Sequence, residues 1–105
     1  MTKLEGIIYL ATNKINNKVY IGQTINTLNK RKTNHYAAAR NEKDNLYFHR
    51  AIRKYGENNF DWIVLDKANN QDKLNELEWF YIAKYKSNNS QYGYNMTSGG
   101  DTHTE

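Results

Sequence analysis

Two short runs of strand-forming residues near the N-terminus, separated by an asparagine-rich turn, most constrain how this chain can fold. Residues 6–12 and 18–22 are rich in isoleucine, valine and tyrosine, and the turn residues 14–17 read Lys-Ile-Asn-Asn. β-Branched and aromatic side chains favour extended strands, whereas asparagine tolerates turn geometry. The pattern therefore predicts a β-hairpin over residues 6–22.

The alternation of side chains along a strand predicts which residues of this hairpin share a face. In the first strand Ile8 and Leu10 point to one side of the sheet and Tyr9 points to the other. A two-residue loop pairs residues of opposite parity, which places Tyr9 and Tyr20 on the same face. We therefore expect two tyrosine hydroxyls on one side of the sheet, with open space beside them at Gly22.

The rest of the chain predicts three helices and one more strand. The expected segments are a helix over residues 28–40 capped by Asn26 or Thr27, a second helix ending at Tyr55-Gly56, a strand over residues 60–65 and a long helix over residues 71–86. Polar stretches at residues 41–45 and 87–91 connect them, and the end of the chain is expected to be irregular. This order predicts a small α+β domain with a three-stranded, mainly antiparallel sheet flanked by helices.

Length and composition limit the class of protein. The 105 residues are expected to form one domain, with a core over about residues 5–100 and a polar tail over residues 101–105. A formal net charge of +4 favours a polyanionic partner, and the lack of cysteine excludes disulfides and thiolate metal sites. No apolar run approaches the ~18 residues of a membrane span, and no secretory signal is visible. We expect a soluble, cytoplasmic protein.

Glu78 is the residue whose position most needs a chemical explanation. It lies four residues after Leu74 and four before Ile82, inside an apolar stripe of the last predicted helix that also includes Leu77 and Tyr81. A carboxylate directed toward a core is costly unless a cation or several donors compensate it. An ion pair, an edge position that reaches solvent and a metal ligand all satisfy this condition. The nearby Glu76 falls on the polar side of the same helix.

Three other polar residues have both an ordinary and a functional interpretation. Arg31 and His35 are one helical turn apart, so they share a face of the helix predicted over residues 28–40. Arginine is well matched to phosphate oxygens, yet Arg31 alone is typical of a helix surface. His35 alone is typical of a structural or exposed histidine. Asn95 alone is typical of a turn.

Taken together, these residues resemble the GIY-YIG endonuclease domain over roughly residues 5 to 100. The resemblance rests on an ordered series: Gly6-Ile7-Ile8-Tyr9, Val19-Tyr20-Ile21-Gly22, Arg31 and His35, Glu78, and Gly93-Tyr94-Asn95. The first triplet departs from the family, because Gly6 stands one position early. The Arg-Lys-Tyr-Gly segment at residues 53–56 and the Gly99-Gly100 pair are most similar to catalytic modules of phage or intron homing endonucleases.

The resemblance implies a role for each residue of the series. Tyr9 would be the general base and Tyr20 would complete the network around water and phosphate, although the two roles can be exchanged. Tyrosine has an ordinary pKa near 10, so positive charge from a metal, Arg31 or His35 would have to assist it. His35 would assist the attacking water or accept a proton from a tyrosine, and its titration near neutral pH suits that task. Arg31 would stabilise the transition state.

The resemblance also assigns a cofactor and two supporting residues. Glu78 would hold a single divalent cation, Mg²⁺ or Mn²⁺, with water and phosphate oxygens completing its coordination. Gly22 would shape the strand beside the tyrosines. Asn95 would hold the geometry of the site by hydrogen bonding.

The second predicted helix carries a basic strip made of Arg50, Arg53 and Lys54, in a segment that resembles one common in phage-type members. Such a strip can contact the DNA backbone with an affinity that depends on salt and little on sequence. A solvated helix face is an equally good interpretation. We assign no catalytic role to His49 in the same segment.

The expected function is therefore metal-dependent hydrolysis of phosphodiester bonds in DNA by a monomer, leaving 5′-phosphate and 3′-hydroxyl ends. One alternative is a non-catalytic nucleic-acid-binding module on the same fold. A second alternative is a structural or partner-binding domain that uses its tyrosine and tryptophan surface. Target choice in this family depends largely on added domains or insertions, and this chain shows none of obvious size.

Overall fold

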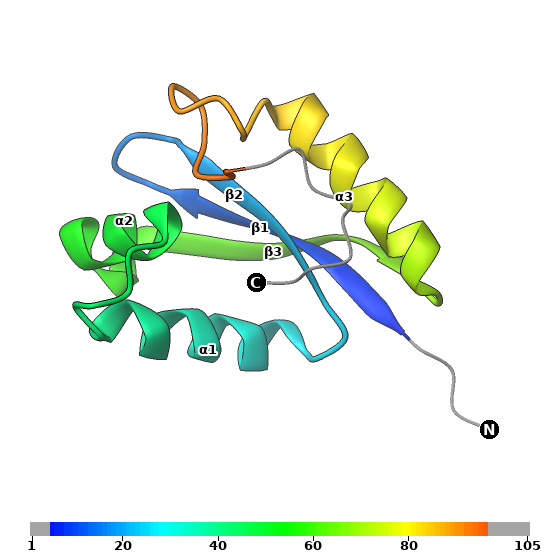
Figure 1. The fold of residues 1–105 in the computed structure, drawn as a ribbon, viewed down its shortest axis with the longest axis horizontal. Helices are drawn as coiled ribbons and strands as arrows, with labels where there is room; N and C mark the ends of the chain where they lie inside the picture. The colour runs from blue at the N-terminus through cyan, green and yellow to red at the C-terminus, as the bar shows by residue number, and fades with distance from the viewer. Residues whose placement is uncertain (1–4, 97–105) are drawn as a thin grey trace.

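The computed structural model describes residues 5–96; the Gly99-Gly100 pair and the tail 101–105 lie outside this range. In chain order the elements are β1 (Gly6–Asn13), β2 (Val19–Thr24), α1 (Leu28–Arg40), α2 (Tyr47–Tyr55), the short 3-10 helix η1 (Glu57–Asn59), β3 (Phe60–Ala68) and α3 (Gln71–Tyr85). The predicted order of segments and the α+β class are confirmed. Helices α1 and α2 lie on one side of the sheet and α3 on the other (Figure 1).

The sheet has the strand order β2-β1-β3, and the central strand β1 runs antiparallel to both neighbours. Tyr9 pairs with Gly22, and Ala11 pairs with Tyr20. Tyr9 and Tyr20 therefore share a face, as predicted. A 2.9 Å hydrogen bond from the backbone N–H of Asn13 to the carbonyl of Lys18 closes the turn between the strands. This closing pair encloses four residues, 14–17, rather than two. Because four is also an even number, the parity of the pairing is unchanged.

Each face of the sheet carries its own core. The face that holds Tyr9 and Tyr20 packs against α1 and α2 through an aromatic cluster whose other members are Ala11, Tyr36, Ala39, Phe48, Ala51, Ile52, Phe60 and Tyr94. The opposite face packs against α3 through aliphatic residues, namely Ile8, Leu10, Val19, Ile21, Leu74 and Ile82. The alternation of side chains in β1 thus separates an aromatic layer from an aliphatic one.

Local signals explain where the elements begin and end. The hydroxyl of Thr27 accepts a hydrogen bond from the backbone N–H of Lys30, so Thr27 rather than Asn26 caps α1. Helix α2 stops at Gly56, whose φ of 95° favours glycine. Strand β3 is longer than expected and reaches Ala68, because β1 pairs with it back to Gly6. None of the helices within residues 5–96 has the length and apolar character needed to cross a membrane.

The described segment after α3 forms turns and one isolated bridge, in agreement with the irregular end that the sequence predicted. The backbone N–H of Val19 donates to the carbonyl of Tyr92, and the N–H of Tyr94 donates to the carbonyl of Val19, which forms a parallel bridge beside β2. Gly93 is required here, since a Cβ on it would lie 2.4 Å from Ser87 Cα and 2.6 Å from the Val19 carbonyl oxygen. The bridge brings residues 92–95 alongside β2.

Candidate active site

The centre of the candidate site is the hydroxyl of Tyr9, a fully buried residue of β1. It lies 2.7 Å from Nε2 of His35 and accepts a hydrogen bond of 3.2 Å from Nε of Arg31. Both partners come from α1, where their i, i+4 spacing directs them toward the same face of the sheet. The structure therefore brings Tyr9 together with two residues that lie more than twenty positions later in the sequence.

Gly22 provides the room for this hydroxyl. A Cβ at position 22 would lie 2.3 Å from the Tyr9 oxygen and 2.4 Å from the ring carbon that carries it. The space that we expected to be open is therefore filled by Tyr9 itself. The glycine is needed because a tyrosine hydroxyl crosses directly over its backbone.

Tyr20 belongs to the same aromatic cluster as Tyr9. Its ring stacks on Phe48, with centroids 4.2 Å apart and planes 3° from parallel, and its edge meets His35 at 5.5 Å. The Tyr9 and Tyr20 rings are 6.3 Å apart. The Tyr20 ring therefore packs beside both Tyr9 and His35.

The electrostatic state of His35 differs from the one that we expected. Burial, the neighbouring Arg31 and then His49 lower the pKa of His35 to about 2. The imidazole is therefore neutral at physiological pH and does not titrate near neutrality. The neutral ring can accept a hydrogen bond from Tyr9, but its low pKa makes it a weak base that would hold a proton only in transit, and it supplies no positive charge to Tyr9. Arg31 carries that charge.

This lowered pKa predicts that the domain loses stability on mild acidification. Below the ordinary histidine pKa of 6.5 the unfolded chain binds a proton that folded His35 refuses, so the stabilisation is complete above pH 6.5 and is lost as the pH falls toward about 2. Between pH 6.5 and 5 the loss should be about 2 kcal/mol. Urea unfolding at both pH values measures it, and a His35→Gln variant should show a shallower dependence. Equal slopes in the two proteins would contradict the lowered pKa.

Glu78 is held at the edge of the sheet, on the α3 side. It is 8 % exposed, and its Oε1 accepts a 3.0 Å hydrogen bond from Nε2 of Gln23 in β2. Gln23 also donates to Asn75, and Gln71 donates to both of these residues. Sequence reasoning missed Gln23. The available signal was alternation, because Gln23 follows Gly22 and so faces the opposite side of β2.

The two halves of the candidate site therefore meet at neighbouring residues of one edge strand. Tyr9 lies over Gly22 from the α1 side, and Glu78 reaches Gln23 from the α3 side. The helices do not place all the polar groups over the tyrosine face. Instead, α3 packs on the other face, and β2, which lies at the edge of the sheet, connects the two groups.

The chemistry of Glu78 fits a magnesium or manganese ion. Within residues 5–96, no group of three or more His, Cys, Asp or Glu side chains is arranged to enclose a metal. Mg²⁺ keeps several waters and commonly uses one or two carboxylates together with the phosphate oxygens of a substrate. A single carboxylate, oriented by an amide donor at a sheet edge, matches this mode of binding.

Asn95 connects the end of the described chain to the same edge strand. Its side-chain amide donates to the carbonyl of Ile21 at 2.8 Å, and its side-chain oxygen accepts from the N–H of Ile21 at 2.9 Å. This paired contact fixes the backbone of β2 immediately before Gly22. The supporting role of Asn95 in the site stays a prediction.

Comparison with known proteins identifies the relatives of this arrangement. Residues 5–95 match the GIY-YIG catalytic domain family. The chain belongs to this family. It is thus a GIY-YIG nuclease domain, and the resemblance on which the sequence analysis relied is confirmed.

Individual relatives of this GIY-YIG domain include a viral protein and two solved structures. An uncharacterized protein, 019R of Invertebrate iridescent virus 6, is 37 % identical over 95 residues; these cover 89 % of this chain and 34 % of the viral protein, about a third of its length. The catalytic domain of intron endonuclease I-TevI, in a glutamate-to-alanine mutant form, matches with a TM-score of 0.76 at 28 % identity, over 90 % of this chain and 96 % of that chain. A structure of the catalytic domain of homing endonuclease I-TevI gives 0.72 at 29 % identity, over 88 % and 98 %.

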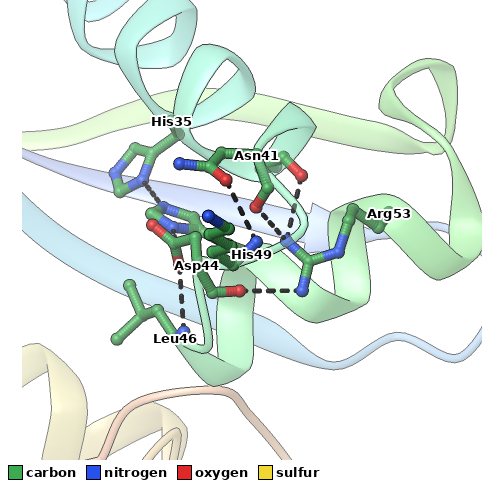
Figure 2. A network of polar contacts seen from close by, with 8 residues as sticks. His35, Asn41, Asp44, Leu46, His49 and Arg53 are labelled. Atoms are coloured by element: carbon green, nitrogen blue, oxygen red, sulfur yellow. Dashed lines mark hydrogen bonds and ion pairs between the residues drawn. The ribbon is translucent and has the colours of Figure 1, made fainter.

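The basic strip of the GIY-YIG domain is not uniform. Arg50 and Lys54 are exposed on α2, and they lie over the rings of Tyr47 and Tyr55. Arg53 instead donates three hydrogen bonds to backbone carbonyls, namely those of Ala39, Asn41 and Asp44 (Figure 2). The guanidinium of Arg53 therefore holds the loop between α1 and α2, and the expected contact of Arg53 with DNA stays a prediction.

The structure also reveals two polar residues of the GIY-YIG domain to which the sequence assigned no role: His49, which was given no catalytic part, and Asp44, which was not considered. His49 of α2 lies 2.7 Å from His35, and Asp44 of the preceding loop lies 3.0 Å from His49. Nothing in the spacing of residues 35, 44 and 49 indicates this contact, because it depends on how α2 packs against α1. The Tyr9–His35 pair is thus the inner part of a longer chain of polar contacts.

Proposed function

We propose that this domain hydrolyses phosphodiester bonds in DNA with the help of Mg²⁺ or Mn²⁺, leaving 5′-phosphate and 3′-hydroxyl ends. The observation that carries the proposal is the placement of the Tyr9 hydroxyl between neutral His35 and cationic Arg31, above the edge strand that holds Glu78 on its other side. A proton acceptor, a positive charge and a carboxylate thus meet at one strand. These are the groups that such a hydrolysis needs.

The chemistry of the general base follows from its two partners. The Tyr9 oxygen takes a proton from the attacking water as the proton of its own hydroxyl moves to Nε2 of His35, 2.7 Å away. The Arg31 N–H, 3.2 Å from the same oxygen, stabilises the negative charge that develops on it during the transfer. Tyr9 therefore acts as a base without ionising in advance.

Charge on the phosphate is balanced by two further groups. The guanidinium of Arg31, permanently charged and planar, stabilises the phosphorane as the water adds. Glu78 would hold the cation, and the bound ion supplies positive charge to the departing 3′ oxygen. Gln23 orients the carboxylate through its 3.0 Å hydrogen bond.

Binding to DNA in this proposal is electrostatic and performed by a monomer. The net charge of +4 and the exposed Arg50 and Lys54 favour contact with the phosphate backbone. Such contacts carry little sequence information. As the family resemblance implies, we expect target choice to depend on added domains or insertions rather than on these contacts.

A nicking assay tests the function. The domain is mixed with supercoiled plasmid in Mg²⁺, Mn²⁺ or EDTA, and we expect nicked product with each metal and none with EDTA. DNA ligase should then reseal the nicks, because it joins only 5′-phosphate to 3′-hydroxyl ends. Salt-dependent binding without cleavage in any metal would instead identify the domain as a nucleic-acid-binding module.

A further inference from the structure

Four side chains form a continuous hydrogen-bonded chain that leads from the candidate general base to the surface. Tyr9 contacts Nε2 of His35 at 2.7 Å, Nδ1 of His35 contacts Nε2 of His49 at 2.7 Å, and Nδ1 of His49 contacts Oδ1 of Asp44 at 3.0 Å. His35 and His49 are buried, whereas the side chain of Asp44 is 26 % exposed. Figure 2 shows the outer half of this chain, where α1, the loop and α2 meet.

The carboxylate at the outer end determines where every proton in the chain lies. An ionised carboxylate only accepts hydrogen bonds, so Nδ1 of His49 must carry a hydrogen. With His49 neutral, its Nε2 is then an acceptor, which requires the hydrogen of His35 to be on Nδ1. Nε2 of His35 is left as an acceptor, and it faces the Tyr9 hydroxyl. Each step follows from the preceding contact.

The loop that carries Asp44 is built to hold this carboxylate in place. Oδ1 of Asp44 also accepts a 3.0 Å hydrogen bond from the backbone N–H of Leu46. The Asp44 carbonyl accepts from Arg53, which also binds the carbonyls of Ala39 and Asn41 and so ties the loop to the end of α1 (Figure 2). The three hydrogen bonds of Arg53 thus help to hold Asp44 beside His49.

We propose that Asp44 and His49 are positioning residues for the general base: they hold His35 in the tautomer that accepts the Tyr9 proton. As His35 accepts that proton on Nε2, it passes the proton on its Nδ1 to His49, beside the Asp44 carboxylate. This inference rests on the proposed function. In the step, a water O–H breaks as a Tyr9 O–H forms, and the original Tyr9 O–H breaks as an Nε2–H forms on His35. The Nδ1–H of His35 then breaks as an Nε2–H forms on His49. One proton has moved from water to His49, which becomes an imidazolium.

The position of the charges explains why the proton should not stop at His35. A protonated His35 would be a buried cation close to Arg31, and these two factors are the largest causes of its lowered pKa. His49 is one residue farther from Arg31 in the chain of contacts and lies 3.0 Å from a carboxylate. Transfer to His49 therefore replaces a repulsion between like charges by an ion pair.

Nitrogen NMR of the labelled domain tests the tautomers without any requirement for cleavage. At neutral pH the ring correlations of His35 and His49 should both show the hydrogen on Nδ1. A hydrogen on Nε2 of either ring would overturn the proposal. Because the measurement needs no DNA, it still decides the inference if the nicking assay shows that the proposed function is wrong.

Asp44→Asn then tests the effect on the reaction. The carboxamide oxygen can still accept from Leu46, so the loop is retained while the negative charge is removed. We expect kcat to fall at least about tenfold with an unchanged KM for DNA. Asp61→Asn is the matched control, since it removes the same charge from an exposed carboxylate on β3. Equal kcat values in Asp44→Asn and Asp61→Asn would overturn the proposal.

Discussion

Replacement of Glu78 by alanine should abolish magnesium-dependent nicking of plasmid DNA and leave the domain folded. The change removes the carboxylate to which we assign the metal, and the lost electrostatic stabilisation of the transition state should lower the rate by at least about a hundredfold. Stability should change little by comparison, because Glu78 lies at the end of an amide network rather than inside the aliphatic core. Initial nicking rates over a range of Mg²⁺ concentrations measure the effect, and circular dichroism monitors the fold.

Two further variants make this experiment decisive. Glu76→Ala removes a glutamate from the exposed side of the same helix, where it pairs with Lys73 at 3.7 Å, and it should nick at the wild-type rate. Glu78→Gln keeps the shape of the side chain and its contact with Gln23 while removing the charge. It should therefore be as inactive as the alanine variant. Nicking by Glu78→Ala at the wild-type rate would rule out Glu78 as the metal ligand.

Replacement of Tyr9 by phenylalanine should lower the rate of cleavage by about 10²–10⁴. The ring would still fill its fully buried site, and only the hydroxyl that contacts His35 and Arg31 would be lost. The loss of these partners should also cost about 1–3 kcal/mol of stability, because buried polar groups would be left unsatisfied. Single-turnover cleavage separates the chemical effect from DNA binding, and urea unfolding measures the stability.

Tyr20→Phe is the matched comparison, because the two tyrosines can exchange roles. The ring of Tyr20 stacks on Phe48 and makes an edge contact with the ring of His35. Tyr9 instead contacts both His35 and Arg31 through its hydroxyl. We therefore expect the smaller kinetic effect in Tyr20→Phe. A larger loss in Tyr20→Phe than in Tyr9→Phe would assign the base to Tyr20.

Local patterns predicted much of the fold. Strand alternation placed Tyr9 and Tyr20 on one face, and Gly56 marked the end of α2, because each signal depends on neighbouring residues alone. The spacing of apolar residues did not reveal that α3 covers the face of the sheet opposite to Tyr9 and Tyr20. The apolar stripe of a helix indicates that the helix packs on something, but it does not indicate which side of a sheet it takes.

The sequence indicated which residues to consider for the candidate site, but it did not indicate their protonation states or hydrogen-bond partners. The ordered motifs indicated Arg31, His35 and Glu78, but the state of His35 depends on burial and on its neighbours, which arise only when α1 and α2 pack together. The same packing turned Arg53 inward to the loop carbonyls. Basic residues spaced along a helix look alike in sequence, and only the loop that α2 meets distinguishes them.

The parallel bridge between Val19 and Gly93 limits how much of the β2 edge is open to pairing with a strand of another molecule. The outer edge of a sheet has backbone groups that can recruit a strand from another molecule, which is a common start of aggregation. Here one of the two edges belongs to β2, the strand that holds both halves of the site, and residues 92–95 occupy part of that edge through the bridge and through Asn95. A shortened domain that ends before Gly93 would present this edge to other chains. The last described segment thus covers part of the exposed edge of the strand that carries both halves of the site.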